Sequence, residues 1–145
     1  MQAQGILEFD GVSYPDGRAS DPRKMGWMEG TPPPPERRMQ FGVQPMLGFP
    51  QIRWSLCHTR ELVPTVNVWR GPGPTGAFAQ APRTQEIEAL RFADLHGRPR
   101  TWDDALHDTY ADGIVVLHRG RCVYERYLGI LEPHIPHSCF SITKS

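Results

Sequence analysis

The 145-residue sequence lacks the features that mark secreted, membrane or nucleic-acid-binding proteins. Its three cysteines are an odd number without paired spacing, which is typical of reduced thiols in a cytoplasm. No apolar run approaches the roughly 20 residues of a membrane span, and the first residues show no signal-peptide pattern. The 16 Lys and Arg balance the 16 Asp and Glu, so no net charge attracts nucleic acid or an anionic membrane. We therefore expect a soluble, cytoplasmic protein that binds neither nucleic acid nor a membrane.

Apolar residues are also scarce, at 39%, against a usual range of about 45–50%. Residues 1–83 hold 12 of the 15 prolines and 10 of the 14 glycines. Residues 31–35 predict extended polyproline-like chain, because each proline ring fixes φ and removes a hydrogen-bond donor. Aromatic residues in this segment favour an ordered arm over disorder. We predict an extended N-terminal arm over residues 1–83, and a different type of structure over residues 84–145.

An alternative function for residues 32–35 is a ligand for an SH3-type domain. The segment has no clear flanking basic pattern of the kind that such ligands carry. Residues 71–76, which are rich in Gly and Pro, predict a second break in the arm.

Residues 101–110 predict a helix. Thr101 can cap it, and Asp103 and Asp104 fall in the first turn, where the helix dipole favours carboxylates. One face is apolar and consists of Trp102, Ala105, Leu106 and Tyr110. Residues 84–92 are compatible with a short helix or with an irregular strand.

Residues 113–127 predict a β-hairpin with Arg119-Gly120 as its two-residue turn. In this register Leu117 pairs with Cys122, and the next two pairs are Val116 with Val123 and Val115 with Tyr124. The apolar run over residues 114–117 predicts a strand covered on both faces, whereas residues 124–127 predict a half-exposed strand.

The last six residues contain a candidate nucleophile and base, Ser141 and Lys144. Residues three apart lie on the same face of a helix. A serine hydroxyl needs a group that accepts its proton, and a lysine whose charged form is disfavoured can do so. The positive end of a helix would favour negative charge near Ser141. Because serine and lysine are common, the simple alternative is a solvated helix start.

Five stretches carry a resemblance to known proteins: residues 25–28, 53–55, 60–65, 110–120 and 140–145. Together they resemble the penicillin-recognising serine hydrolases, the superfamily of serine β-lactamases, DD-peptidases and related esterases and amidases. The closer resemblance is to 6-aminohexanoate-dimer (nylon-oligomer) hydrolases and their β-lactamase-related homologues. The resemblance implies an α+β, β-lactamase/transpeptidase-like fold. Residues 84–145 would be the N-terminal part of such a domain, incomplete after the Ser-x-x-Lys motif, with the first antiparallel hairpin and the start of the nucleophile helix.

The resemblance also implies roles for the two candidate residues. Ser141 would attack an amide or ester carbonyl of a small substrate such as a 6-aminohexanoate oligomer and form an acyl-enzyme, with Lys144 as its proton acceptor. No cofactor is implied. In the family, a second oxyanion donor and a tyrosine that assists proton transfer follow this motif. We therefore expect the chain to be the N-terminal portion of such an enzyme, truncated after the motif, and to be inactive by itself.

Two alternatives stay open. A non-catalytic remnant or binding protein, in which the Ser-x-x-Lys motif has lost its role, would have no activity of its own. Metal binding by His134, His137 and Cys139, or by Cys57 and His58, would need a ligand spacing that matches no standard zinc site. We therefore expect no metal.

Overall fold

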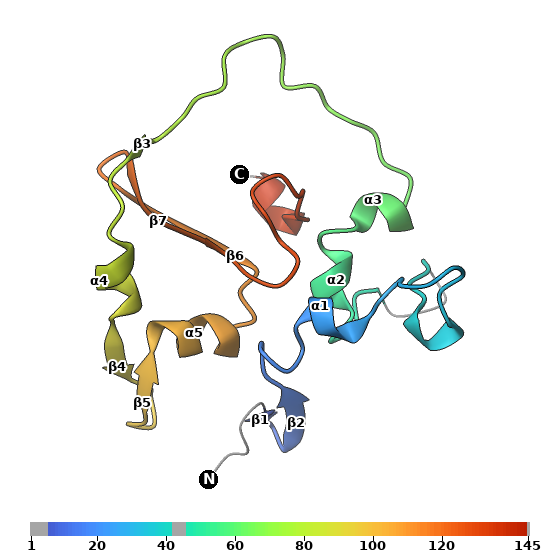
Figure 1. The fold of residues 1–145 in the computed structure, drawn as a ribbon, viewed down its shortest axis with the longest axis horizontal. Helices are drawn as coiled ribbons and strands as arrows, with labels where there is room; N and C mark the ends of the chain where they lie inside the picture. The colour runs from blue at the N-terminus through green and yellow to red at the C-terminus, as the bar shows by residue number, and fades with distance from the viewer. Residues whose placement is uncertain (1–5, 42–45, 145) are drawn as a thin grey trace. The chain divides into compact units, whose positions relative to one another are not determined.

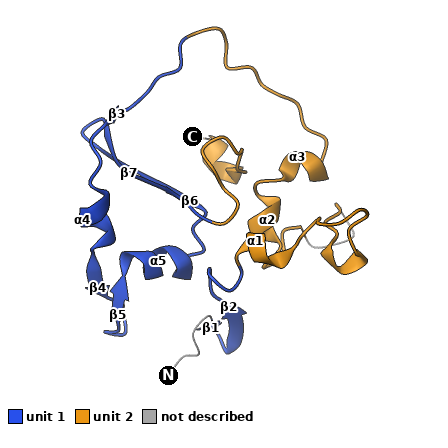
Figure 2. Cartoon of the chain, viewed as in Figure 1, with its two compact units in different colours: residues 1–20, 74–128 blue, residues 21–73, 129–145 orange. Residues whose placement is uncertain are grey.

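The computed structural model describes residues 6–41 and 46–144 and combines short helices with small sheets, in agreement with the predicted α+β class (Figure 1). The chain divides into two compact units, residues 1–20 with 74–128 and residues 21–73 with 129–145 (Figure 2). The two units do not coincide with the expected segments 1–83 and 84–145, because residues 1–20 group with residues 74–128. The expected division into an arm and a hydrolase domain stays a prediction. No helix among the described residues is long and apolar enough to cross a membrane.

The first unit contains all seven strands of the described residues. Its elements are β1 (Ile6–Phe9), β2 (Val12–Pro15), β3 (Ala79–Gln80), α4 (Thr84–Glu88), β4 (Arg91–Ala93), β5 (Pro99–Thr101), α5 (Trp102–Asp108), β6 (Gly113–His118) and β7 (Arg121–Tyr127). Strand β7 pairs with β6 in an antiparallel and with β3 in a parallel arrangement. The pairs β1–β2 and β4–β5 form two separate hairpins. The ambiguous residues 84–92 thus contain both a short helix and the start of a strand.

The β6–β7 hairpin confirms the predicted turn and corrects part of the register. Arg119 and Gly120 have φ values of 51° and 75°, as a two-residue turn of this kind requires. Leu117 lies opposite Cys122 as predicted, but Val116 lies opposite Tyr124. Val123 is therefore the extra residue of a β-bulge, which shifts the register of all pairs beyond it.

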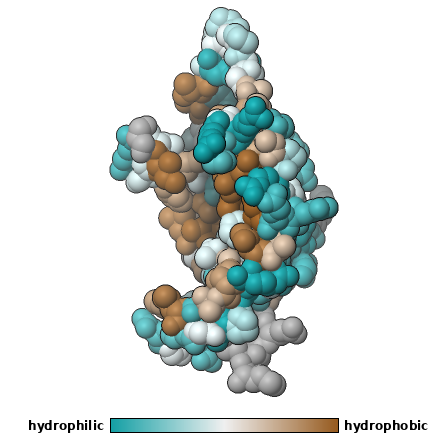
Figure 3. Space-filling model, turned by 90° about the vertical axis from the view of Figure 1, so that its left-hand side faces the viewer, coloured by the Kyte–Doolittle hydropathy of each residue, from teal (hydrophilic) through white to brown (hydrophobic). Residues whose placement is uncertain are grey.

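The burial of the hairpin differs from the prediction, except at residues 125–127, which are exposed or partly exposed as predicted. Val115 and Leu117 of β6 are 50% and 45% exposed, whereas Cys122 and Tyr124 of β7 are buried. Exposure alternates along β6, where Ile114 and Val116 are half-buried, so one face of this strand is covered by the described residues and the other is not. In the described part of the chain β6 also lies at the edge of the sheet. Apolar side chains accordingly reach the surface between hydrophilic ones (Figure 3).

Helix α5 begins as predicted. Thr101 Oγ1 accepts from Asp104 N (3.0 Å), and the Asp104 side chain accepts from Thr101 N (3.0 Å), which completes a capping box. Leu106 is buried on the apolar face. The helix ends two residues earlier than predicted, at Asp108. Tyr110 has a φ of 52° and lies outside the helix, where its hydroxyl donates to Pro15 O (2.9 Å).

Segments distant in sequence meet at Asp103. Its carboxylate accepts from Arg18 and from Arg126, each at 2.6 Å. Burial is the largest single effect and works against the charged carboxylate, but the hydrogen bonds and positive charges of its neighbours, Arg126 and Arg18 first, together outweigh it and lower the pKa of Asp103. Nearby, Gly17 N donates to His107 O (3.1 Å), and a Cβ on Gly17 would lie only 2.4 Å from that oxygen. Residues 16–18 are thus fitted closely against α5.

The second unit contains short helices joined by loops. They are α1 (Pro22–Met25), η1 (Pro35–Arg37), α2 (Ile52–Ser55), α3 (Thr59–Leu62) and η2 (Phe140–Lys144). The expectation of extended chain over residues 31–35 is correct for Pro34 (φ −62°, ψ 150°) but wrong for Pro35, which begins the 3₁₀ helix η1. Helices α2 and α3 lie in the predicted arm. Each has four residues, which is too short to show a helical period in the sequence.

Candidate active site

The Ser-x-x-Lys motif lies on η2, which is a 3₁₀ helix and not the first turn of an α-helix as expected. Side chains three residues apart eclipse one another in a 3₁₀ helix, so Ser141 and Lys144 lie on the same side of the turn. Among the described residues no hydrogen bond joins Ser141 Oγ and Lys144 Nζ. Ser145, the residue after the motif, lies outside the described residues.

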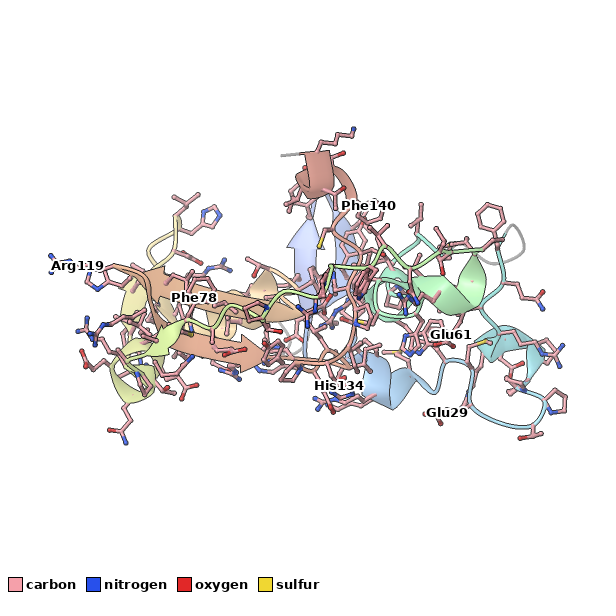
Figure 4. All side chains as sticks on the ribbon, turned by 90° about the horizontal axis from the view of Figure 1, so that it is seen from above. Glu29, Glu61, Phe78, Arg119, His134 and Phe140 are labelled. Atoms are coloured by element: carbon pink, nitrogen blue, oxygen red, sulfur yellow. The ribbon has the colours of Figure 1, made fainter. Side chains whose placement is uncertain are left out.

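Phe140 sets the direction of the chain immediately before Ser141. It has a φ of 44°, in the left-handed region that bulky residues rarely adopt. Its side chain is 61% exposed at the start of η2 (Figure 4). Such strained positions are concentrated at functional sites, because the surrounding structure must hold them in place. The sharp turn presents Ser141 at the surface.

The segment that leads into η2 is held by the corner between α2 and α3. Ser138 N donates to Leu56 O (2.9 Å), and the hydroxyls of Ser138 and Thr59 are 2.6 Å apart. Further along, Ile142 N donates to Cys139 O (3.2 Å) and closes the first turn of η2. The loop, the corner and the motif all belong to the second unit.

Ser141 and Lys144 are both exposed, as are the apolar side chains between and beside them. Ile142, for example, is 77% exposed. A lysine becomes a good proton acceptor when burial or a neighbouring cation disfavours its charged form. The described residues therefore place the candidate nucleophile and the candidate base on one side of a turn, without the burial that such a pair needs for activation.

Sequence reasoning did not assign a catalytic role to the tyrosines before the motif. In the structure Tyr124 donates to Glu88 Oε1 (3.2 Å), and Tyr127 donates to Glu125. Together with Tyr110, these residues have structural partners in the first unit.

The candidate metal ligands have other contacts. His58 stacks on Trp54 with a centroid distance of 3.8 Å, and His137 Nδ1 is 3.1 Å from Ser138 O. His134 Nδ1 is 3.6 Å from a carboxylate oxygen of Glu132. Within residues 6–41 and 46–144, no three His, Cys, Asp or Glu side chains group so that they could hold a metal ion. All three cysteines are free thiols.

Sequence reasoning missed Ser138 and Thr59. They are 79 residues apart, and neither belongs to a recognisable pattern. The sequence indicates their contact only indirectly. Thr59 lies between residues 53–55 and 60–65, and Ser138 lies just before residues 140–145, and all three stretches contribute to the same family resemblance.

Comparison with known proteins gives one informative match. No family model matches the sequence, and no curated protein matches it. A solved structure described as "Putative 6-aminohexanoate-dimer hydrolase from Bacillus anthracis" is similar, with a TM-score of 0.58 and 28% sequence identity. The similarity covers 65% of this chain and 24% of the other, so the chain spans about a quarter of the length of that protein. The structure is thus similar to that of a protein described as a hydrolase.

Proposed function

We propose that the chain supplies the nucleophile-bearing segment of a β-lactamase-related serine hydrolase. Its substrates would be small molecules with amide or ester bonds, such as 6-aminohexanoate oligomers. The observation that carries the proposal is the structural similarity, at 28% identity, to a protein described as a 6-aminohexanoate-dimer hydrolase. The position of Ser141 and Lys144 on one side of η2 supports it.

In the proposed reaction Ser141 Oγ attacks the substrate carbonyl carbon, and its proton passes to the neutral amine of Lys144. The backbone N–H of Ser141 supplies one hydrogen-bond donor to the oxyanion of the tetrahedral intermediate. Collapse of this intermediate breaks the bond to the leaving amine or alcohol, which takes up the proton. Water then attacks the acyl-serine and releases the carboxylic acid, so that Ser141 is restored.

The test is covalent labelling of the full-length product of the gene with a fluorophosphonate, followed by peptide mapping. We expect the adduct on Ser141 and none in Ser141→Ala. Lys144→Ala should abolish hydrolysis of a small amide and leave the fold unchanged, because the substitution removes a proton acceptor and not a core side chain. An adduct on another serine, or full activity in Ser141→Ala, would contradict the proposal. Absence of both label and hydrolysis in the wild type would favour a non-catalytic binding protein.

The 145 residues alone should have no measurable hydrolase activity. Loss of one oxyanion donor typically lowers the rate by about 10²–10³-fold, and the described residues show no enclosed environment around Ser141. The measurement is hydrolysis of the same small amide by the purified 145-residue chain, and turnover that depends on Ser141 would refute the expectation.

A further inference from the structure

The corner between α2 and α3 holds the chain immediately before the candidate nucleophile. Two hydrogen bonds reach Ser138 from this corner, one to its backbone N–H and one to its side chain. Only Cys139 and Phe140 separate Ser138 from Ser141. The position of the corner therefore limits where Ser141 can lie.

The direction of the side-chain hydrogen bond follows from a count of protons. The Thr59 hydroxyl lies 3.1 Å from Ser55 O, and a carbonyl oxygen can only accept. A hydroxyl carries one proton, so Thr59 donates to Ser55 O and accepts from Ser138 Oγ. The result is a directed chain of hydrogen bonds from Ser138 through Thr59 to the backbone of α2, in which each bond polarises the next.

The carbonyl group of Ser55, at which this series of hydrogen bonds ends, is held firmly in place. Ser55 is 1% exposed and Trp54 is 6% exposed. The ring of His58 stacks on Trp54 with an interplanar angle of 2°, and its Nδ1 donates to Trp54 O (2.8 Å). A buried carbonyl on a packed corner is a more rigid anchor than an exposed loop, because packed side chains have few alternative positions.

We propose that Thr59 and Ser138 are positioning residues that hold the Ser141 turn in the geometry required for acylation. This inference rests on the proposed function of Ser141. Neither side chain touches the substrate in the proposed reaction. They act through the backbone of residues 139 and 140, where a small displacement of the nucleophile has a large effect on the rate.

The test compares variants in the full-length gene product. Thr59→Val keeps the shape of the side chain and removes the hydroxyl, and we expect it to slow fluorophosphonate labelling of Ser141 by about 10- to 100-fold. Ser138→Ala should slow labelling less, because the bond from Thr59 Oγ1 to Ser55 O remains, whereas Thr59→Val removes that bond as well as the one to Ser138. Thr59→Ser restores the hydroxyl and should restore a rate close to that of the wild type.

The matched control is Thr109→Val. Thr109 Oγ1 also donates to a backbone carbonyl, Ala105 O (2.8 Å), but it belongs to the first unit. This variant should be labelled at the wild-type rate. Equal rates for Thr59→Val and wild type, equal slowing by Thr109→Val, or failure of Thr59→Ser to restore the rate would each overturn the inference.

Hydrogen exchange separates this inference from the proposed function. In Thr59→Val the amides of Ser138 and Ile142 should exchange faster than in the wild type, and in Thr59→Ser they should not. If wild-type Ser141 takes no label, the proposed function fails and the role in acylation fails with it. The exchange rates then still decide whether the pair holds the segment, and unchanged rates in Thr59→Val would overturn that part too.

Discussion

Helices α5 and η2 differ in how many interactions hold them. Helix α5 has a complete capping box at Thr101, a buried Leu106 and ion pairs through Asp103. The residues of η2 are all exposed, and the helix is tied to the second unit through the loop residue Ser138. The comparison shows that residue spacing alone brings Ser141 and Lys144 to one side of a turn. Activation of that pair requires burial and charge that local sequence does not supply.

The largest expected difference between the two helices is in packing. Leu106 is 4% exposed, and Leu106→Ala should lower the free energy of opening of α5 by about 2–5 kcal/mol, because it leaves a cavity. Ile142→Ala on η2 should change local stability by no more than about 0.5 kcal/mol, since Ile142 is 77% exposed. Amide hydrogen exchange of α5 and of η2 measures both. Similar effects of the two substitutions would mean that η2 is as well packed as α5.

A smaller difference in helix stability is expected when the hydroxyls of Thr101 and Thr143 are removed, each of which forms a hydrogen bond at its helix. Thr101→Ala removes the acceptor for Asp104 N and should cost about 1 kcal/mol of helix stability. Thr143→Ala removes a hydroxyl that donates to Phe140 O on the exposed η2, and we expect an effect within about 0.5 kcal/mol. Exchange rates of the amides in the first turn of each helix provide the measurement. A larger loss at Thr143 would contradict the view that η2 depends on the loop that precedes it.

The features predicted correctly from the sequence have local causes. The start of α5 follows from Thr101 and the acidic residues after it, and the hairpin turn follows from Gly120, because in both cases the chemistry lies within four residues. The bulge at Val123 could not be predicted in this way. Its position depends on how β7 fits between two other strands.

The candidate site shows the same limit. The spacing of Ser141 and Lys144 is evident in the sequence, but the 3₁₀ helix that carries them and the left-handed Phe140 at its start are not. The support from Thr59 to Ser138 spans 79 residues, and no local pattern reveals a contact between segments so far apart. Equally, the hydrogen bonds of Asp103 to Arg18 and Arg126 appear only in the folded unit.

The smallest expected effect is a dependence of the stability of α5 on pH through His107. Burial of its ring and the nearby Arg18 cation lower the pKa of His107 below its ordinary value, although Asp103 at 3.7 Å partly opposes this. The unfolded chain then binds a proton more readily than the folded chain. The stabilising contribution is present above about pH 6.5 and is lost as the pH falls from there through the lowered pKa.

Hydrogen exchange of α5 between pH 5 and 8, corrected for the intrinsic effect of pH, should therefore show a small loss of protection at the acidic end. His107→Gln should remove this slope, because the glutamine side chain does not titrate. The carboxylates of Asp103 and Asp104 do not interfere in this range, since hydrogen bonds and nearby arginines lower the pKa of each. Protonation of these two carboxylates should destabilise α5 only when the pH falls below the ordinary pKa of an aspartate, about 3.9. A slope of the opposite sign would mean that the attraction of Asp103 to His107 outweighs the burial of the ring.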